Sequence, residues 1–183
     1  RDPEMSRGLG DVYKRQESNL FDGSGMERVD VEQRAEKARR FFLEGYNCAQ
    51  AVVLAYCDLF DISLSLAASI SAPLGGGMGR LREVCGAVSG MFMVAGLFYK
   101  NDVPSDMTKR KIVYSTVQDL AEKSKALNGS IICRELLGLD HKSDSPTPEA
   151  RTETYYKRRP CADYVASAAR LIGEKLNEVS EEM

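Results

Sequence analysis

Residues 47–60 read NCAQAVVLAYCDLF, and residues 83–99 read EVCGAVSGMFMVAGLFY. Both stretches are apolar nearly all the way round a helix, which is typical of helices buried at the centre of a domain. We therefore expect two central helices, over residues 47–60 and 83–99, with the rest of the chain packed around them.

The segments around these two stretches also have a helical period, and Gly, Asn or Pro residues mark their ends. Helices are predicted over residues 31–43, 65–71, 105–127, 132–137 and 160–179, with a flexible glycine loop over 75–79 and an exposed loop over 140–148. No stretch alternates with a period of two, and Ile131-Ile132 is the only faint strand candidate. The sequence thus predicts an all-α fold, a single-domain helical bundle with two apolar central helices.

The composition is that of an ordinary globular domain. The chain has 183 residues, of which 43% are hydrophobic and 28% are charged, and its net charge is −2. This balance excludes a disordered chain and provides no basic footprint for nucleic acid or for an anionic membrane. No run of about 18 apolar residues indicates a transmembrane helix. The chain has one histidine, His141, so a His-rich metal site is excluded. The five cysteines are therefore the main candidates for reactive residues.

The first 25 residues differ from the rest of the chain. They lack the apolar core of a secretory signal, and Met26 follows the stretch Gly23-Ser24-Gly25. We interpret residues 1–25 as a cloning scar or a disordered leader, and residues 26–183 as one helical domain. Without a signal peptide we expect a cytoplasmic protein, whose reduced thiols would be catalytic, redox-sensing or metal-binding.

Four of the five cysteines share one position, in the first turn of a predicted helix. Unpaired N–H groups and the positive end of the helix dipole stabilise a thiolate there, which lowers its pKa. Arginines close in the sequence, such as Arg82, Arg134 and Arg159, would add positive charge near a sulfur. No cysteine pair has the C-x-x-C spacing of zinc ribbons and thioredoxins. The four residues are Cys48, Cys85, Cys133 and Cys161.

Helical spacing predicts where these thiols point. Cys161 shares a face with Val165 and Ile172, so it faces the core, and Cys48 lies on the apolar face of its own helix in the same way. We therefore expect several thiols to converge on one partly buried place. Cys57 comes nine residues after Cys48, on the opposite helix face, and is interpreted as a packing residue.

Two glycines, Gly86 and Gly90, lie one turn apart in the same helix as Cys85. Glycine costs about 1 kcal/mol relative to alanine inside a helix, so both need a structural reason. A tight helix crossing, or room for a substrate beside Cys85, would supply one. The glycine run at residues 75–79 lacks the P-loop and dinucleotide-binding patterns, so a phosphate cradle is not favoured.

The chain resembles a known family over nearly its full length, from about Ala35 to Lys175, and the resemblance rests on several separate blocks. They are GYNCAQA at 45–51, GGGMG at 75–79, CGAVSG at 85–90, CRELLG at 133–138, and Cys161 in the last helix. Together they are similar to the C_GCAxxG_C_C family, which is named for its cysteine pattern and regarded as redox-active. The family pattern has Gly-Cys-Ala where this chain has Cys85-Gly86-Ala87, so the match at Cys85 is shifted by one position.

The resemblance implies a helical, cytosolic protein whose four helix-start thiols form a redox or metal centre, and it implies no particular substrate. Three functions stay open. The first is a thiol-based redox protein, a thiol oxidoreductase, that uses these cysteines for thiol–disulfide chemistry or electron transfer. Cys48 and Cys85 would be the exchange pair, with Cys133 and Cys161 as resolving thiols or a second pair. The second is a metal or iron–sulfur protein, with zinc or a cluster held by Cys48, Cys85, Cys133 and Cys161. The third is a non-enzymatic helical interaction module with incidental cysteines.

The expected cofactor and partners depend on which of these three functions the protein has. A thiol redox protein needs no cofactor, and its partner would be an unidentified redox protein or a small thiol substrate, with neither nucleic acid nor a membrane involved. The apolar helices could also form a homo-oligomer interface.

Overall fold

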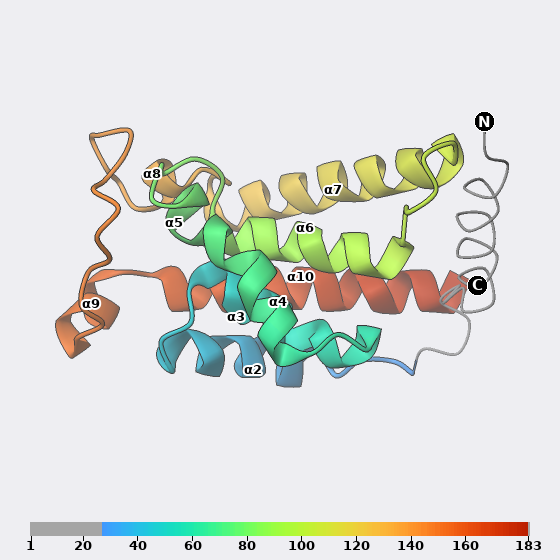
Figure 1. Cartoon of the computed structure of the whole chain (residues 1–183), viewed down its shortest axis with the longest axis horizontal. Coiled ribbons are helices and arrows are strands. Elements are labelled where there is room, and N and C mark those ends of the chain that lie inside the picture. Colours follow the sequence, from blue (N-terminus) through green and yellow to red (C-terminus); the bar gives the residue numbers. More distant parts are fainter. Residues whose placement is uncertain (1–26, 183) are drawn as a thin grey trace, which may run out of the picture.

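The computed structural model describes residues 27–182, in which helices are joined by loops (Figure 1). The long helices are α2 (Val31–Leu43), α3 (Cys48–Tyr56), α6 (Gly86–Tyr99), α7 (Met107–Asn128) and α10 (Cys161–Glu182). The short elements are η3 (Cys57–Phe60), α4 (Leu64–Ser71), η4 (Ala72–Leu74), α5 (Gly75–Met78), α8 (Cys133–Leu136) and α9 (Glu153–Arg158).

The predicted all-α, single-domain fold is confirmed. The described residues contain no β-strand, and the Ile131-Ile132 strand candidate contributes one isolated antiparallel bridge, between Val84 and Ile132. None of the helices in residues 27–182 is both long enough and apolar enough to span a bilayer. The prediction for residues 1–25 lies outside the described residues.

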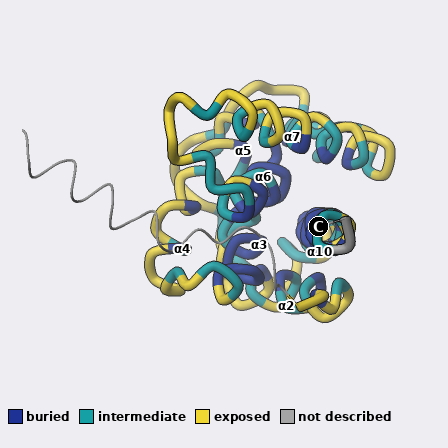
Figure 2. The backbone as a smooth tube through the Cα atoms, turned by 90° about the vertical axis from the view of Figure 1, so that its right-hand side faces the viewer, coloured by how far each residue is buried: buried dark blue, intermediate teal, exposed yellow. Residues whose placement is uncertain are grey.

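Helices α3 and α6 lie at the centre of the bundle, as their composition predicts. Figure 2 shows them as mainly dark blue, buried segments among α2, α7 and α10. Helix α10 packs against α2, α3, α6 and α7. It buries Val165 and Ile172 there, so the core-facing stripe predicted for the last helix is confirmed.

Asn47 fixes the start of α3. Its side-chain oxygen accepts hydrogen bonds from the backbone N–H groups of Ala49 at 3.1 Å and Gln50 at 3.0 Å, and the Gln50 side chain accepts one from the Asn47 N–H at 2.9 Å. This capping box satisfies donors that have no partner within the first turn. The Asn47 amide also donates to the Ala72 carbonyl at 2.9 Å, which joins the start of α3 to η4. Cys48 is consequently held at the first helical position.

Helices α3 and α6 approach each other closely at two glycines of α6. A Cβ added to Gly86 would lie 3.2 Å from the Cβ of Cys48, and one added to Gly90 would lie 2.8 Å from the carbonyl oxygen of Ala49. Because these distances are shorter than ordinary contacts, both positions require glycine. The predicted tight crossing is confirmed, and it places Cys85, the N-cap of α6, at the same end as Cys48.

Several elements differ from the predicted ones, in their bounds or in their presence. Helix α6 begins at Gly86 rather than at residue 83, because the Glu83 carbonyl accepts a hydrogen bond from the backbone of Cys133 at 2.6 Å instead of joining the helix. Residues 57–60 form the separate 3₁₀ helix η3. Helix α9, over Glu153–Arg158, is not predicted by the sequence.

Alanine at Gly90 should destabilise the protein, whereas alanine at Gly96 of the same helix should stabilise it. A Cβ at Gly96 would meet no atom within 4 Å. We expect Gly90→Ala to lower the free energy of unfolding by about 1–3 kcal/mol through overpacking against α3. Gly96→Ala should raise it by about 0.5–1 kcal/mol through helix propensity. Urea unfolding followed by circular dichroism measures both, and equal effects of the two substitutions would contradict the tight crossing.

Candidate functional site

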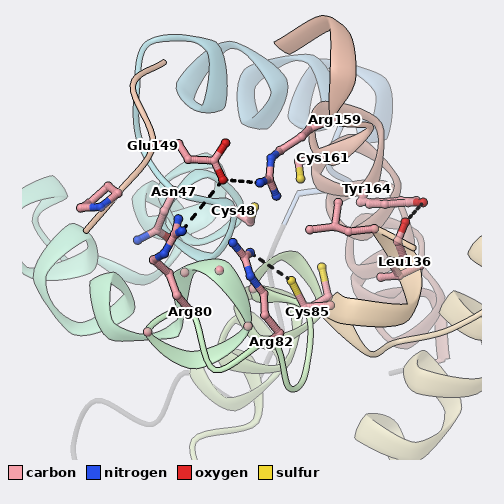
Figure 3. Close-up of a pocket in the computed structure, with 18 of the residues that line it drawn as sticks. Asn47, Cys48, Arg80, Arg82, Cys85, Leu136, Glu149, Arg159, Cys161 and Tyr164 are labelled. Carbon is pink, nitrogen blue, oxygen red and sulfur yellow. Dashed lines mark hydrogen bonds and ion pairs between the residues drawn. The ribbon is translucent and has the colours of Figure 1, made fainter. Parts of the chain in front are cut away.

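A cavity of about 250 Å³ lies where α3, α6, α8 and α10 begin (Figure 3). Cys48, Cys85, Cys133 and Cys161 all line it. Cys85 is the N-cap of α6, and the other three occupy the first position of their helices. The predicted helix-start position of these cysteines and their convergence on one place are therefore confirmed.

Cys48 and Cys161 both line the cavity, and each shifts the pKa of the other. The hydrogen bond that Cys48 donates lowers the pKa of Cys161, and the charges of Arg159 and Arg151 lower it further against the effect of burial. The same hydrogen bond raises the pKa of Cys48 well above its ordinary value, and burial adds to this rise. Cys161 also starts the 22-residue helix α10, whose dipole favours an anion at that end. Of the two, Cys161 is the thiol that ionises more readily.

The other two thiols of the cavity stay protonated. Burial raises the pKa of Cys85 to about 12, although two backbone N–H groups at the start of α6 favour its anion. Burial also raises the pKa of Cys133, although Arg82 donates to its sulfur at 3.7 Å. The prediction that a helix start lowers the pKa of all four thiols is therefore wrong for Cys48, Cys85 and Cys133, because burial and the thiol pair outweigh the N–H groups and the dipole.

Cys57 lies apart from the cavity. It is 2% exposed, belongs to the hydrophobic core, and donates to the Leu54 carbonyl at 3.4 Å. Its interpretation as a packing residue is confirmed, and it provides a control thiol for experiments on the other four.

Of the three arginines expected to act on the cysteine next to them in sequence, Arg159 does lower the pKa of Cys161, whereas the other two have different partners. Arg82, three residues before Cys85, donates to Cys133 instead. Arg134, the neighbour of Cys133, forms an ion pair with Glu83 at 3.1 Å. A guanidinium group that lies near a cysteine in sequence therefore need not act on that thiol.

Part of the cavity wall comes from segments in which the sequence predicts no site. Residues 140–148 are predicted to be an exposed loop, yet Pro146 and Pro148 line the cavity and Asp144 pairs with Arg82 at 2.5 Å. Glu149 and Arg151, between this loop and α9, also line the cavity. This stretch is polar and has no helical period, so no local pattern marks these residues.

The glycine segment forms a left-handed turn instead of the predicted flexible loop. Residues 76–80 all have φ between +60° and +71°. The Gly79 N–H donates to the Gly75 carbonyl at 3.0 Å. A positive φ is unfavourable at Met78 and Arg80, and such strain persists only where surrounding contacts hold it. The turn directs Arg80 toward the cavity, where Figure 3 shows its guanidinium group.

The four cysteines are not arranged as a metal centre. Within residues 27–182, no three His, Cys, Asp or Glu side chains are placed so that they could hold a metal ion together. Arg82 also donates to the Cys133 sulfur, and its positive charge opposes a metal cation at that position. The geometry therefore does not fit the zinc or iron–sulfur alternative.

The fold and the cavity define a class of protein, a helical domain with four thiols gathered at the starts of its helices. The family model described as "Putative redox-active protein (C_GCAxxG_C_C)" matches residues 46–175. The chain belongs to this family, as the resemblance of its sequence blocks indicates. A search of the curated proteins and a search of the solved structures each found no match.

Alanine at Gly77 should disturb the site more than alanine at Gly79. Both residues have positive φ, of 70° and 60°, so both variants carry backbone strain of about 1–2 kcal/mol. A Cβ at Gly77 would lie 2.6 Å from the Cβ of Cys133, whereas one at Gly79 would meet no atom closer than 3.8 Å. We expect Gly77→Ala to lose about 1–3 kcal/mol more stability and to alter the alkylation of Cys133.

Urea unfolding and peptide mass spectrometry after iodoacetamide labelling measure these two effects. Equal losses of stability in the Gly77→Ala and Gly79→Ala variants, with unchanged labelling of Cys133, would show that the turn does not pack on this cysteine.

Cys161 should be alkylated at lower pH than the other cavity thiols. The thiolate is the form of cysteine that reacts with alkylating agents. Cys161 should therefore keep reacting until the pH falls through its lowered pKa. Cys85, with a pKa of about 12, should react only at high pH. Cys48→Ala removes the hydrogen-bond donor and should shift the Cys161 profile to higher pH. Cys57→Ala should leave it unchanged.

Iodoacetamide labelling over a pH series, read by peptide mass spectrometry, measures these profiles. A wild-type Cys161 that titrates at or above the pH of free cysteine would contradict its lowered pKa.

Proposed function

We propose that the protein is a thiol oxidoreductase in which Cys161 is the attacking thiolate and Cys48 is the resolving thiol. The observation that carries this proposal is the placement of both thiols in the wall of one cavity, where Cys48 lowers the pKa of Cys161. Thiol–disulfide exchange needs an accessible thiolate with a second thiol next to it. The sequence favours Cys48 with Cys85 as the exchange pair, and the effect of Cys48 on the pKa of Cys161 now favours Cys48 with Cys161.

The proposed reaction transfers two electrons from the protein to a substrate disulfide. The Cys161 thiolate attacks one substrate sulfur, the substrate S–S bond breaks, and the leaving thiolate takes a proton from solvent. Cys48 then loses its proton and attacks the sulfur of Cys161. This step releases the second substrate thiol, which takes up a proton, and leaves a Cys48–Cys161 disulfide. The reverse sequence oxidises a dithiol substrate.

The thiol pair supports this order of steps. While Cys161 is a thiolate, its hydrogen bond and its negative charge raise the pKa of Cys48. Both effects end once Cys161 is part of a mixed disulfide, because its sulfur is then neutral. The pKa of Cys48 therefore falls at the step in which its thiolate is needed.

Cys85 and Cys133 form a second pair in this proposal. Both are 6% exposed, and the segments that carry them are joined by backbone hydrogen bonds, from Cys85 to Ile131 at 2.8 Å and from Cys133 to Glu83 at 2.6 Å. Two electrons from these thiols would reduce the Cys48–Cys161 disulfide by a second exchange. Because the thiols must be regenerated, we place the protein in a reducing compartment, the cytoplasm.

Limited oxidation with 2-hydroxyethyl disulfide should join Cys48 to Cys161. Peptide mass spectrometry should find this disulfide first, and Cys57→Ala should behave as the wild type does. The Cys48→Ala variant should accumulate a mixed disulfide on Cys161, because it lacks the resolving thiol. If the cavity thiols do not react, and Cys48→Ser and Cys161→Ser change only stability, the protein is a helical interaction module instead.

A further inference from the structure

The cavity beside the thiols is lined by four arginines. Figure 3 shows Arg80 and Arg82 entering it from the glycine-turn segment, and Arg159 entering it from the segment before α10. Arg151 also lines the cavity. Positive charge from three separate segments of the chain therefore meets next to the sulfur of Cys161.

Two carboxylates offset part of this charge. Asp144 pairs with Arg82 at 2.5 Å and with Arg80 at 3.7 Å. Glu149 pairs with Arg159 and, at 3.9 Å, with Arg80. Arg82 and Arg159 thus each have a close acidic partner, whereas the contacts of Arg80 with both carboxylates are long.

Arg151 has no carboxylate partner within residues 27–182. Its guanidinium carbon lies 4.7 Å from the ring centre of Phe42 and 4.9 Å from that of Tyr155. It donates to the Tyr46 carbonyl at 3.5 Å, and its Nη1 is buried without a hydrogen-bond partner among the described residues. An arginine held by aromatic rings, with its charge unpaired, is suited to binding an anion.

The charges of the cavity do not cancel even when the thiolate is included. Four guanidinium groups face the carboxylates of Asp144 and Glu149, which leaves two positive charges in excess, or one once Cys161 is ionised. A buried positive charge favours a ligand that brings one negative group.

We propose that the substrate of the thiol pair is a small disulfide or thiol with a carboxylate group, which Arg80 and Arg151 bind while the substrate sulfur faces Cys161. This inference rests on the proposed function and adds the class of substrate to it. A cavity of about 250 Å³ accommodates one small molecule. Leu136 and Leu137 supply an apolar wall for its carbon chain.

Three disulfides of similar length separate the effect of charge from that of size. 3,3′-Dithiodipropionate carries two carboxylates, 2-hydroxyethyl disulfide is neutral, and cystamine carries two ammonium groups. Peptide mass spectrometry gives the rate at which each oxidises the Cys48–Cys161 pair, and each rate is divided by that of free cysteine at the same pH and ionic strength. We expect the normalised rate for dithiodipropionate to be about tenfold above that of the neutral disulfide, with cystamine slowest.

The wild-type comparison distinguishes failure of this inference from failure of the proposed function. Equal normalised rates for the three disulfides, or a fastest reaction with cystamine, would overturn the anionic substrate class and leave disulfide exchange in place. If none of the three oxidises the pair, disulfide exchange itself is overturned, and the substrate class with it.

Arg80→Gln tests the binding site directly, with Arg158→Gln as a matched control. Arg158 also pairs with Glu149, at 3.0 Å, but it is exposed and is not part of the cavity wall. We expect Arg80→Gln to reduce the rate ratio of dithiodipropionate to 2-hydroxyethyl disulfide by about five- to tenfold, and Arg158→Gln to leave this ratio unchanged. The ratio is taken within each variant, so a general loss of reactivity cancels. An unchanged ratio in Arg80→Gln would overturn the proposed carboxylate site.

Discussion

The close contact of α3 with α6 at Gly86 and Gly90 is the constraint on which the cavity depends. Since these two positions have no side chain, the start of α3, with Cys48, and the start of α6, with Cys85, lie at one end of the bundle. Helix α10 packs against both helices and brings Cys161 to the same end. Helix starts carry backbone N–H donors without intrahelical partners, so the fold gathers its thiols where negative charge is stabilised.

Bringing the thiols together does not ionise them equally. Burial disfavours a thiolate more strongly than a helix start favours it, so the pKa values of Cys85 and Cys133 rise. Cys161 differs because a hydrogen bond from Cys48 and the charge of Arg159 act on its sulfur in addition to the dipole of α10. This asymmetry suits exchange chemistry better than four ionised thiols would, because neighbouring thiolates repel one another, whereas a thiol and a thiolate attract.

The left-handed turn supplies positive charge next to these sulfur atoms, and it does so at a cost in backbone strain. Met78, Arg80 and Arg82 all have positive φ, and residues held in such conformations cost on the order of 1–3 kcal/mol each. The paired and hydrogen-bonded guanidinium groups help to hold the turn, since Arg82 bonds Asp144 and Arg80 donates to the Ser145 carbonyl. The irregular segment that carries these acceptors thereby becomes part of the site.

The amino-acid sequence by itself determined the all-α fold, the two buried central helices and the helix-start positions of the four cysteines. These features depend on apolar periodicity, caps and glycine or proline stops, which act within a few residues. Only the tertiary structure decided which thiol ionises most readily, that Arg82 acts on Cys133 and pairs with Asp144, and that Arg151 lines the cavity. These points depend on burial and on contacts between distant segments. Arg82 and Asp144, for example, are 62 residues apart in the sequence. No pattern within a few residues of the sequence encodes such a contact.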